Sequence, residues 1–312
     1  ILAQGRPQKG GAAVACAAME SDAAHPRPRR VLVCGWGAAA EVVLHEIAVY
    51  AGRGAAVVSC ISGVSQASDC DLREVCDRLG FPCALHDRDE EIFAVARDFA
   101  PDLLVSASYR KRLPIRVLEL CTDSINFHPS LLPKHRGCWS GFWCIFDGDA
   151  ETGVTCHRMV EKFDEGRLLH QERVAVAADD TSVSLYKRLL PVTGDCARHV
   201  LRLYFAGELP QGEEQRGPAS YHFRRLPFDG LIQAEWSDEQ VERFIRAMYF
   251  PPFDGAAVAI GDKKILVESL EDYRRLRQGA AATAAVVAEC AASVAATGLV
   301  AAAVECAETG TS

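Results

Sequence analysis

Three polar side chains in this sequence could together move a proton and stabilise a developing negative charge. Asn126 and His128 stand two residues apart, so on an extended strand both side chains point to the same face. An amide and an imidazole placed in this way can offer two hydrogen-bond donors to one oxyanion. Asp164 could reach the same pocket from a short loop, where its charge would favour the imidazolium form of His128. Taken alone, the residues also suit a buried core histidine and an Asn-x-His pair that braces a loop.

A second pattern with functional meaning is the turn Gly35-Trp36-Gly37, which with Ala40 satisfies the loose form GxGxxA. A dinucleotide site would also need an acidic residue about 20 positions later, at the end of the second strand. Residues 60–63 read Cys-Ile-Ser-Gly instead. We therefore interpret the turn as tight strand-to-helix packing or as an anion-binding helix start, and the pattern disfavours a nicotinamide-dependent reductase.

From residue 30 onward, short apolar runs alternate with amphipathic stretches, which is typical of parallel strands joined by crossover helices. The periodicity predicts strands at 31–34, 56–61, 81–85, 103–106, 124–128, 153–159 and 168–176, and helices at 38–50, 72–79, 90–99, 113–120, 139–146 and 181–205. The fold class is therefore α/β, with a Rossmann-like, mostly parallel sheet. Asn126 and His128 fall at the carboxyl end of a strand, the edge where open α/β sheets bind ligands.

The composition along the chain predicts five segments. Residues 1–29 lack hydrophobic periodicity, and we expect a disordered leader there; Glu20 and Asp22 interrupt it and weaken an organellar targeting signal without excluding one. Residues 30–206 form the α/β domain, and 207–219 are a polar linker rich in Gly, Pro and Glu. Residues 220–277 form a small C-terminal α+β module, and 278–312 are an Ala-rich tail to which we assign no function.

Charge and hydropathy exclude several classes of protein. The 312 residues are 49% hydrophobic, which is ample for a core, yet no apolar run reaches the roughly 18 residues of a membrane-spanning helix. A formal charge of -8 argues against a protein that mainly binds a phosphate backbone. The thirteen cysteines form no CxxC pair, which indicates free thiols in a reducing compartment and a cytoplasmic protein. The histidines lack metal-site spacing, so we expect no metal.

The residues around Asn126 and His128 resemble a known signature. The stretch 125–137 reads INFHPSLLPKHRG, and residues 163–169 read FDEGRLL. In 10-formyltetrahydrofolate-dependent formyltransferases an Asn-x-His pair precedes an SLLP loop and a Gly, and a distant Asp-x-Gly completes the site. Residues 108–114 (SYRKRLP), 148–155 (GDAETGVT) and 168–176 (LLHQERVAV) extend the resemblance, which covers about residues 31–205.

The resemblance implies the formyltransferase fold and a division of roles among the residues. Asn126 and His128 would stabilise the oxyanion formed when an amine attacks the formyl group, and Asp164 would help to move the proton; no metal is implied. The resemblance assigns contacts with the 10-formyltetrahydrofolate cosubstrate to Tyr109, Arg110, Leu113, Pro114, Val160, Phe163, Glu165 and Gly166. The acceptor contacts that we expect are Ser130, Lys134, His135, Arg136, Gly35 and Trp36.

The C-terminal module bears on the acceptor. Residues 221–230 (YHFRRLPFDG) and 251–255 (PPFDG) resemble the start of the C-terminal region shared by methionyl-tRNA and sugar N-formyltransferases. Between residues 226 and 277 there are ten acidic and seven basic side chains, an unpromising surface for tRNA. We therefore favour a small amine, such as a nucleotide-linked amino sugar, over initiator tRNA.

Three alternatives remain open at this point. Methionyl-tRNA formyltransferase is the main one. The run PKHRG at 133–137 also resembles the hydrolase domain of formyltetrahydrofolate dehydrogenase, in which water replaces the amine. A folate-binding protein without turnover is the third, and the intact set of Asn126, His128 and Asp164 argues against it. The sequence leaves the oligomeric state open, a homodimer included.

Overall fold

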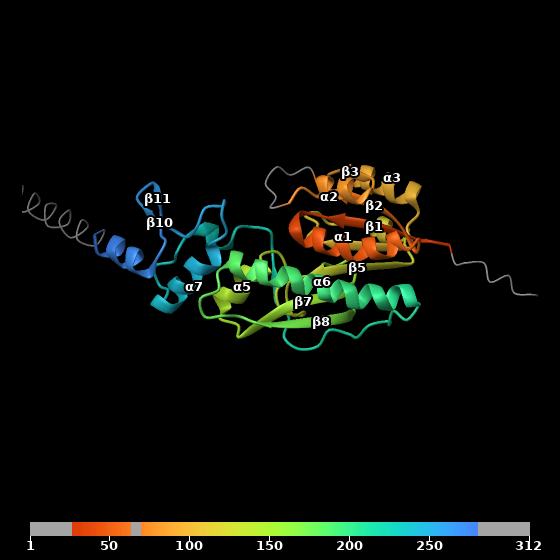
Figure 1. Cartoon of the computed structure of the whole chain (residues 1–312). Coiled ribbons are helices and arrows are strands. Elements are labelled where there is room, and N and C mark those ends of the chain that lie inside the picture. Colours follow the sequence, from red (N-terminus) through yellow and green to blue (C-terminus); the bar gives the residue numbers. More distant parts are fainter. Residues whose placement is uncertain (1–26, 64–69, 280–312) are drawn as a thin grey trace, which may run out of the picture.

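The computed structural model describes residues 27–63 and 70–279. Its largest part is built on a seven-stranded sheet, which lies at the right in Figure 1. The strand order is β3-β2-β1-β4-β5-β7-β8. The first five strands in this order are parallel, and β7 and β8 are antiparallel to their neighbours. Their bounds are β1 (Arg29–Gly35), β2 (Ala56–Ser62), β3 (Cys83–Leu85), β4 (Leu103–Ala107), β5 (Asp123–His128), β7 (Glu151–Arg158) and β8 (Leu168–Ala175). The predicted α/β class with a mostly parallel sheet is confirmed.

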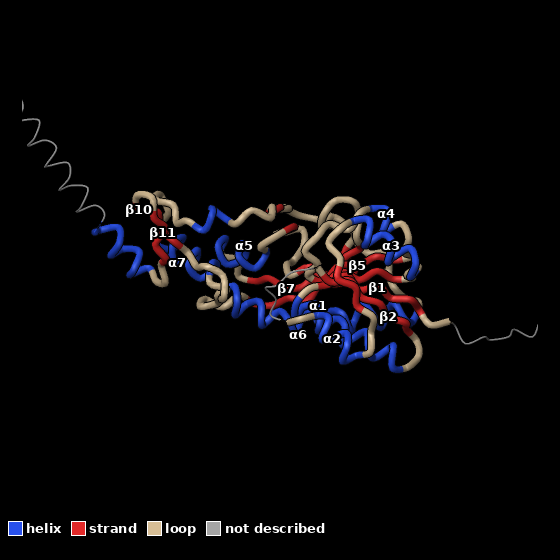
Figure 2. Tube along the Cα trace, turned by 90° about the horizontal axis from the view of Figure 1, so that it is seen from above, coloured by secondary structure: helices blue, strands red, loops and turns tan. Residues whose placement is uncertain are grey.

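Helices cover both faces of the sheet (Figure 2). One face packs against α1 (Gly37–Gly52), α2 (Leu72–Leu79) and α6 (Ser182–Ala206), and the other packs against α3 (Asp89–Phe99) and α4 (Ile115–Leu118). Alternate residues of β1 show the division, because Val31 and Val33 lie in the core beneath α1 while Leu32 and Cys34 lie in the core beneath α3. The hydrophobic effect of these two buried layers holds the sheet in place.

Local sequence signals set several of the helix boundaries. Thr181 and Ser184 form a capping box at the start of α6, and Gly207 ends the helix in the left-handed conformation. The α4 helix is shorter than the predicted 113–120, because Pro114 occupies its N-cap position with an extended backbone. The short β3 begins at Cys83, after Pro82.

The C-terminal part is built on the end of the sheet domain around α5 (Ser140–Asp147), and it lies at the left in Figure 1. It contains η1 (Pro227–Gly230), α7 (Asp238–Met248) and an antiparallel hairpin of β10 (Ala257–Ile260) and β11 (Lys263–Leu266), and residues 270–279 are helical. A ring cluster joins α5 to this part through Phe142, Phe146, Phe228, Trp236 and Phe244. Buried residues of α7 therefore belong to the same core as α6.

Residues 207–219, predicted as a linker, bond to the sheet domain. Leu168 and Glu213 exchange two backbone hydrogen bonds of 2.7 and 2.8 Å. The chain then enters β9 (Tyr221–His222), which pairs in parallel with β6 (Arg136–Gly137). Within the residues that the structure describes, no helix is both long and apolar enough to cross a membrane.

Gly153 marks a point where two strands and a loop approach too closely for a side chain. A Cβ atom there would lie 1.9 Å from the Glu172 carbonyl oxygen and 2.8 Å from the Leu131 side chain. We expect Gly153→Ala to lower the free energy of unfolding by about 2 to 3 kcal/mol, because β7, β8 and the 131 loop must move apart. Urea denaturation measures this loss.

Gly52→Ala provides the matched control, since no atom lies within 4 Å of a Cβ built at this end of α1. Alanine favours the helix over glycine by up to about 1 kcal/mol, so this variant should be as stable as the wild type or slightly more so. Equal stability of the two variants would contradict the packing argument.

Candidate active site

Two neighbouring antiparallel strands bring the central side chains together. On β5, Asn126 and His128 point to the face that carries α3 and α4, and Asn126 is opposite His157 on β7. Asp164 completes a group that we call the central cluster: Asn126, His128, His157 and Asp164. The Asn126 Nδ2 atom lies 3.4 Å from Asp164 Oδ1, and the His128 Nδ1 atom lies 3.5 Å from Asp164 Oδ2. The structure thus brings the three predicted residues within reach of one another.

Asp164 reaches the cluster because the β7–β8 loop folds back over β5. The loop begins beside the amino end of β5, where the Met159 N–H bonds to the Ser124 carbonyl. Asp164 itself has a left-handed backbone with a φ of 55°. Close packing requires glycine two residues later, since a Cβ at Gly166 would lie 1.8 Å from the Arg158 carbonyl oxygen. The Gln215 side chain then donates to the Asp164 and Gly166 carbonyls at 2.6 and 2.8 Å.

The Asp164 carboxylate is ionised although it is only 8% exposed. Burial raises its pKa, but His128, His157 and the Gly137 N–H together outweigh that effect, and the resulting pKa lies below the ordinary value. The Gly137 N–H donates to Asp164 Oδ2 at 2.7 Å. The cluster therefore holds a fixed negative charge among hydrogen-bond donors.

His128 is buried, and one of its ring nitrogens is already committed. Its Nε2–H donates to the His135 backbone carbonyl at 2.8 Å, which leaves Nδ1 facing Asp164. Burial lowers the pKa of His128, and the Asp164 carboxylate and the His135 carbonyl oppose this effect without reversing it. The carboxylate thus favours the imidazolium, as the sequence led us to expect, but burial has the larger effect and the pKa of His128 lies below its ordinary value.

His157 is a member of the cluster that the sequence did not reveal. It is 1% exposed, and its Nδ1–H donates to the Arg158 carbonyl at 2.8 Å. In the neutral ring Nε2 then accepts from the Asn126 amide nitrogen at 3.1 Å, which orients that amide, and it lies 3.3 Å from Asp164 Oδ1. The only sequence signal was its place on a predicted strand, and the pairing of that strand with β5 is a long-range feature.

The two segments predicted to bind the cosubstrate are bonded to each other. Between them, the Arg112 guanidinium donates to the Glu161 carbonyl at 2.9 Å. Val160 and Phe163 keep nearly half of their surface exposed, which leaves apolar area on the loop for a flat ring. Glu165 forms ion pairs with Arg136 and Lys162. Four predicted residues lie in the turn before α4: Tyr109 and Leu113, partly buried against the core, Arg110 over the Trp36 ring, and Pro114 at the N-cap.

Most of the residues predicted to contact an acceptor already have partners within the protein, and the indole N–H of Trp36 is the exception. Ser130 donates to the Lys134 carbonyl at 2.6 Å, and Lys134 pairs with Asp149. Arg136 bonds to Gln215, and Gly35 packs so tightly that a Cβ would lie 2.5 Å from that of Ala40. Both ring nitrogens of His135 are also engaged, so this residue has none to offer an acceptor. The Trp36 indole N–H is buried and has no acceptor among the described residues.

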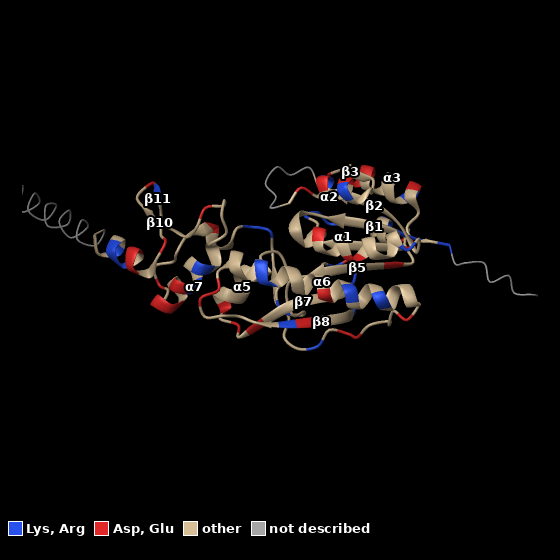
Figure 3. Ribbon diagram, viewed as in Figure 1, with Lys and Arg blue, Asp and Glu red and all other residues tan. Residues whose placement is uncertain are grey.

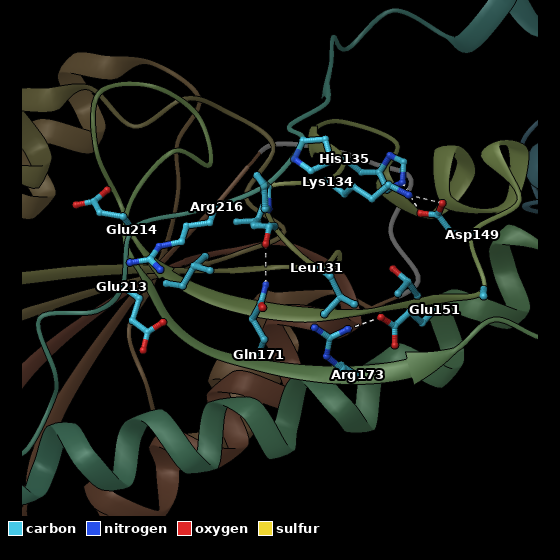
Figure 4. Close-up of a pocket in the computed structure, with 16 residues that line it drawn as sticks. Leu131, Lys134, His135, Asp149, Glu151, Gln171, Arg173, Glu213, Glu214 and Arg216 are labelled. Carbon is cyan, nitrogen blue, oxygen red and sulfur yellow. Dashed lines mark hydrogen bonds and ion pairs between the residues drawn. The ribbon is translucent and has the colours of Figure 1, made fainter.

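A pocket of about 440 Å³ lies along the 131–135 loop (Figure 4). Gln171 and Arg173 of β8 form its floor, and Lys134, Asp149 and Glu151 lie along one side. None of the central cluster lines it. Among residues 27–63 and 70–279, no three His, Cys, Asp or Glu side chains form a group that could hold a metal ion.

Comparison with known proteins gives a consistent picture. A family model described as Formyl transferase matches residues 56–200. The chain is 39% identical over 259 residues to the GDP-perosamine N-formyltransferase of Brucella melitensis, covering 80% of this chain and 96% of that protein. The protein of the same name from Brucella abortus matches equally well.

Solved structures share the fold. A sugar N-formyltransferase from a Shewanella species superposes with a TM-score of 0.64 at 19% identity, covering 77% of this chain and 96% of the other. An N-formyltransferase from Helicobacter canadensis, solved with folinic acid and dTDP-3-aminofucose, has a TM-score of 0.62 at 18% identity, covering 76% and 86% of the two chains. At these identities the likeness concerns the arrangement of the chain.

The lowered pKa of Asp164 makes a prediction about stability. In the unfolded chain this carboxyl titrates near the ordinary aspartate value of about 4. Because its folded pKa is lower, the ionised group stabilises the fold above that value, and the contribution is lost as the pH falls toward the folded pKa. The unfolding free energy of the wild type should therefore fall more steeply between pH 5 and pH 3 (roughly the window of this titration) than that of Asp164→Asn. Parallel curves in urea denaturation would show that the pKa is not lowered.

Proposed function

Because the chain belongs to the formyl transferase family, we propose that this formyltransferase transfers the formyl group of 10-formyltetrahydrofolate to the amine of a nucleotide-linked amino sugar. The observation that carries the proposal is 39% identity to GDP-perosamine N-formyltransferases across 96% of their length. The close grouping of Asn126, His128 and Asp164 supports it independently, since these side chains suit an amine attack on a carbonyl carbon.

We place the folate against the turn before α4 and the β7–β8 loop. Val160 and Phe163 give the loop an exposed apolar surface, against which the flat ring of a pterin can pack. The formyl group would then lie over Asn126 and His128. The structure of the Helicobacter canadensis N-formyltransferase with folinic acid and dTDP-3-aminofucose supports a folate and a nucleotide-linked amino sugar as the ligand pair.

The reaction begins when the amine nitrogen attacks the formyl carbon and forms a C–N bond. The electron pair of the C=O bond moves to oxygen. The oxyanion accepts the Asn126 N–H that makes the long 3.4 Å bond to Asp164 in the resting site, while the other N–H stays on His157 Nε2. The nitrogen then loses a proton to the free Nδ1 of neutral His128, and Asp164 stabilises the imidazolium that forms. The oxyanion then re-forms the C=O bond as the bond from the formyl carbon to the folate nitrogen breaks, and that nitrogen takes the proton from the His128 imidazolium.

This order of events explains why a neutral His128 suits the reaction. A ring with a lowered pKa can accept the amine proton, whereas a resting imidazolium could not. His128 then becomes positively charged beside the oxyanion at the stage of the reaction when the oxyanion is present. Asp164 stays ionised throughout, because its lowered pKa keeps it a weak proton acceptor of its own.

A small acceptor also fits the surface of the C-terminal part. Its acidic and basic residues alternate along α7 and the β10–β11 hairpin, where red and blue segments of the ribbon lie close together (Figure 3). With ten acidic and seven basic residues between 226 and 277, the region lacks the positive surface that tRNA needs. We assign the enzyme to the cytoplasm, and the ten described cysteines, all free, support a reducing compartment.

Asp164→Asn tests the mechanism directly. The substitution removes the charge that stabilises the imidazolium, so we expect formyl transfer to slow by about 10²- to 10⁴-fold. Binding of folinic acid, measured by fluorescence titration, should stay within a few-fold of the wild type. The control is Asp123→Asn at the other end of β5, where the carboxylate pairs with Arg158 and should not affect turnover. Unchanged turnover in Asp164→Asn would refute the mechanism.

The acceptor is identified by incubating the enzyme with 10-formyltetrahydrofolate and one candidate amine at a time. We expect a GDP-linked amino sugar to gain the mass of one CO, and initiator methionyl-tRNA to remain unchanged, as judged by mass spectrometry. Formylation of the tRNA alone would favour the methionyl-tRNA alternative. Release of formate at the same rate with and without an amine would indicate a hydrolase.

A further inference from the structure

Two histidines distant in the sequence, His135 and His222, meet beside the central cluster. His135 lies on the loop after β5, and His222 lies on β9, beyond residues 207–219. Their Nδ1 and Nε2 atoms are 3.1 Å apart, and the two rings are nearly parallel with centroids 5.3 Å apart. His135 is 2% exposed and uses its other nitrogen, Nε2, to bond Asp149 at 2.9 Å (Figure 4). The proposed mechanism uses neither ring.

The Asp149 carboxylate decides which nitrogen of each neutral ring carries the hydrogen. The Asp149 carboxylate accepts a hydrogen bond from the Nε2–H of His135. In the neutral ring Nδ1 then has no hydrogen and accepts a hydrogen bond itself. The donor is the Nε2–H of His222. Burial, and to a lesser degree the neighbouring His135, lower the pKa of His222 to about 4. The titratable and charged groups around the His135 ring are Asp149, Asp147 of α5, Lys134, His128 of β5 and His222.

The backbone beside His135 supplies two groups to the central cluster. His135 has a left-handed φ of 56°, and its carbonyl oxygen accepts a hydrogen bond from the Nε2–H of His128. Two residues later, the Gly137 N–H donates to Asp164. β9 supports the same segment from behind, because a Cβ at Gly137 would lie 2.2 Å from the His222 carbonyl oxygen. The tautomer of His128 and the position of Asp164 therefore depend on the backbone conformation of residues 135–137.

We propose that His222 is a positioning residue of the active site: by holding the His135 ring, it fixes the backbone carbonyl that orients His128. A segment that follows the sheet domain thus completes the support of the catalytic histidine. The kinetic part of this inference rests on the proposed function, whereas the geometry of His128 can be observed without turnover.

The Trp143 ring allows a clean substitution at this position. It stacks on His222 with centroids 4.2 Å apart and an angle of 10°. In His222→Phe the flat ring can keep this contact while the N–H donor is lost. His222→Gln restores an N–H donor near the position of Nε2. The control is His199→Phe, because His199 stacks on His170, which bonds the Glu172 carboxylate at 2.7 Å, in a comparable pair away from the cluster.

The kinetic experiment compares these variants of the full chain with the acceptor that the wild type formylates. We expect His222→Phe to lower kcat about tenfold, as a small displacement of a catalytic group does, with the folate KM within about twofold of wild type. His222→Gln should recover most of the loss, and His199→Phe should match the wild type. Wild-type kcat in His222→Phe, or a loss that glutamine does not reverse, would overturn the proposal.

A second variant changes the contact on the opposite side of the His135 ring. It tests the proposal even if His222→Phe does not fold. Asp149→Asn weakens the other bond to the His135 ring without touching β9 or Trp143. We expect a lower kcat at unchanged folate KM here as well. Combined with His222→Gln, it should be no slower than Asp149→Asn alone. An unchanged kcat in Asp149→Asn would overturn the proposal.

Histidine ¹⁵N spectra separate this inference from the proposed function. In the wild type, His128 should show the single tautomer with the proton on Nε2, and in His222→Phe or Asp149→Asn a mixture of tautomers. If the wild type formylates no acceptor, the proposed function fails, yet these spectra still decide the positioning role. An unaltered His128 tautomer in both variants would refute it.

Discussion

The buried carboxylate of Asp164 is the constraint on which the rest of the active site depends. An unpaired charge inside a protein costs several kcal/mol, so a carboxylate at 8% exposure persists only among donors. The Gly137 N–H and the Asn126 amide provide them, and His128 and His157 stand beside it. These donors come from separate stretches of chain. The buried carboxylate can therefore stay ionised only after the fold has brought those stretches together.

Antiparallel pairing of β7 with β5 brings these stretches together. It sets His157 opposite Asn126 and starts the following loop at the amino end of β5, from where the loop folds back across the strand. The left-handed backbone of Asp164 and the absence of a side chain at Gly166 allow this return. A parallel β7 would begin its outgoing loop at the other edge of the sheet. The change of direction in an otherwise parallel sheet therefore has a functional consequence.

Residues beyond the α/β domain also support the cluster. Gln215 holds the backbone of Asp164 and Gly166, and β9 pairs with the strand that contains Gly137. The stretch predicted as a linker therefore lies against the sheet domain, and its Gln215 side chain bonds to the active-site loop. Its richness in Gly, Pro and Glu suits an irregular path along the sheet domain as well as it suits a free tether, and composition alone does not distinguish the two.

The sequence by itself determined the order of helices and strands, because the periods of 2 and 3.6 and the caps at Thr181 and Gly207 are local. It also placed Asn126 and His128 on one face, and the family signature pointed to Asp164. Only the tertiary structure decided that His157 joins them, that the His135 ring is buried between Asp149 and His222, and that burial lowers the pKa of His128. Strand register, burial and the partners of a buried group depend on residues far apart in the chain, and no local pattern records them.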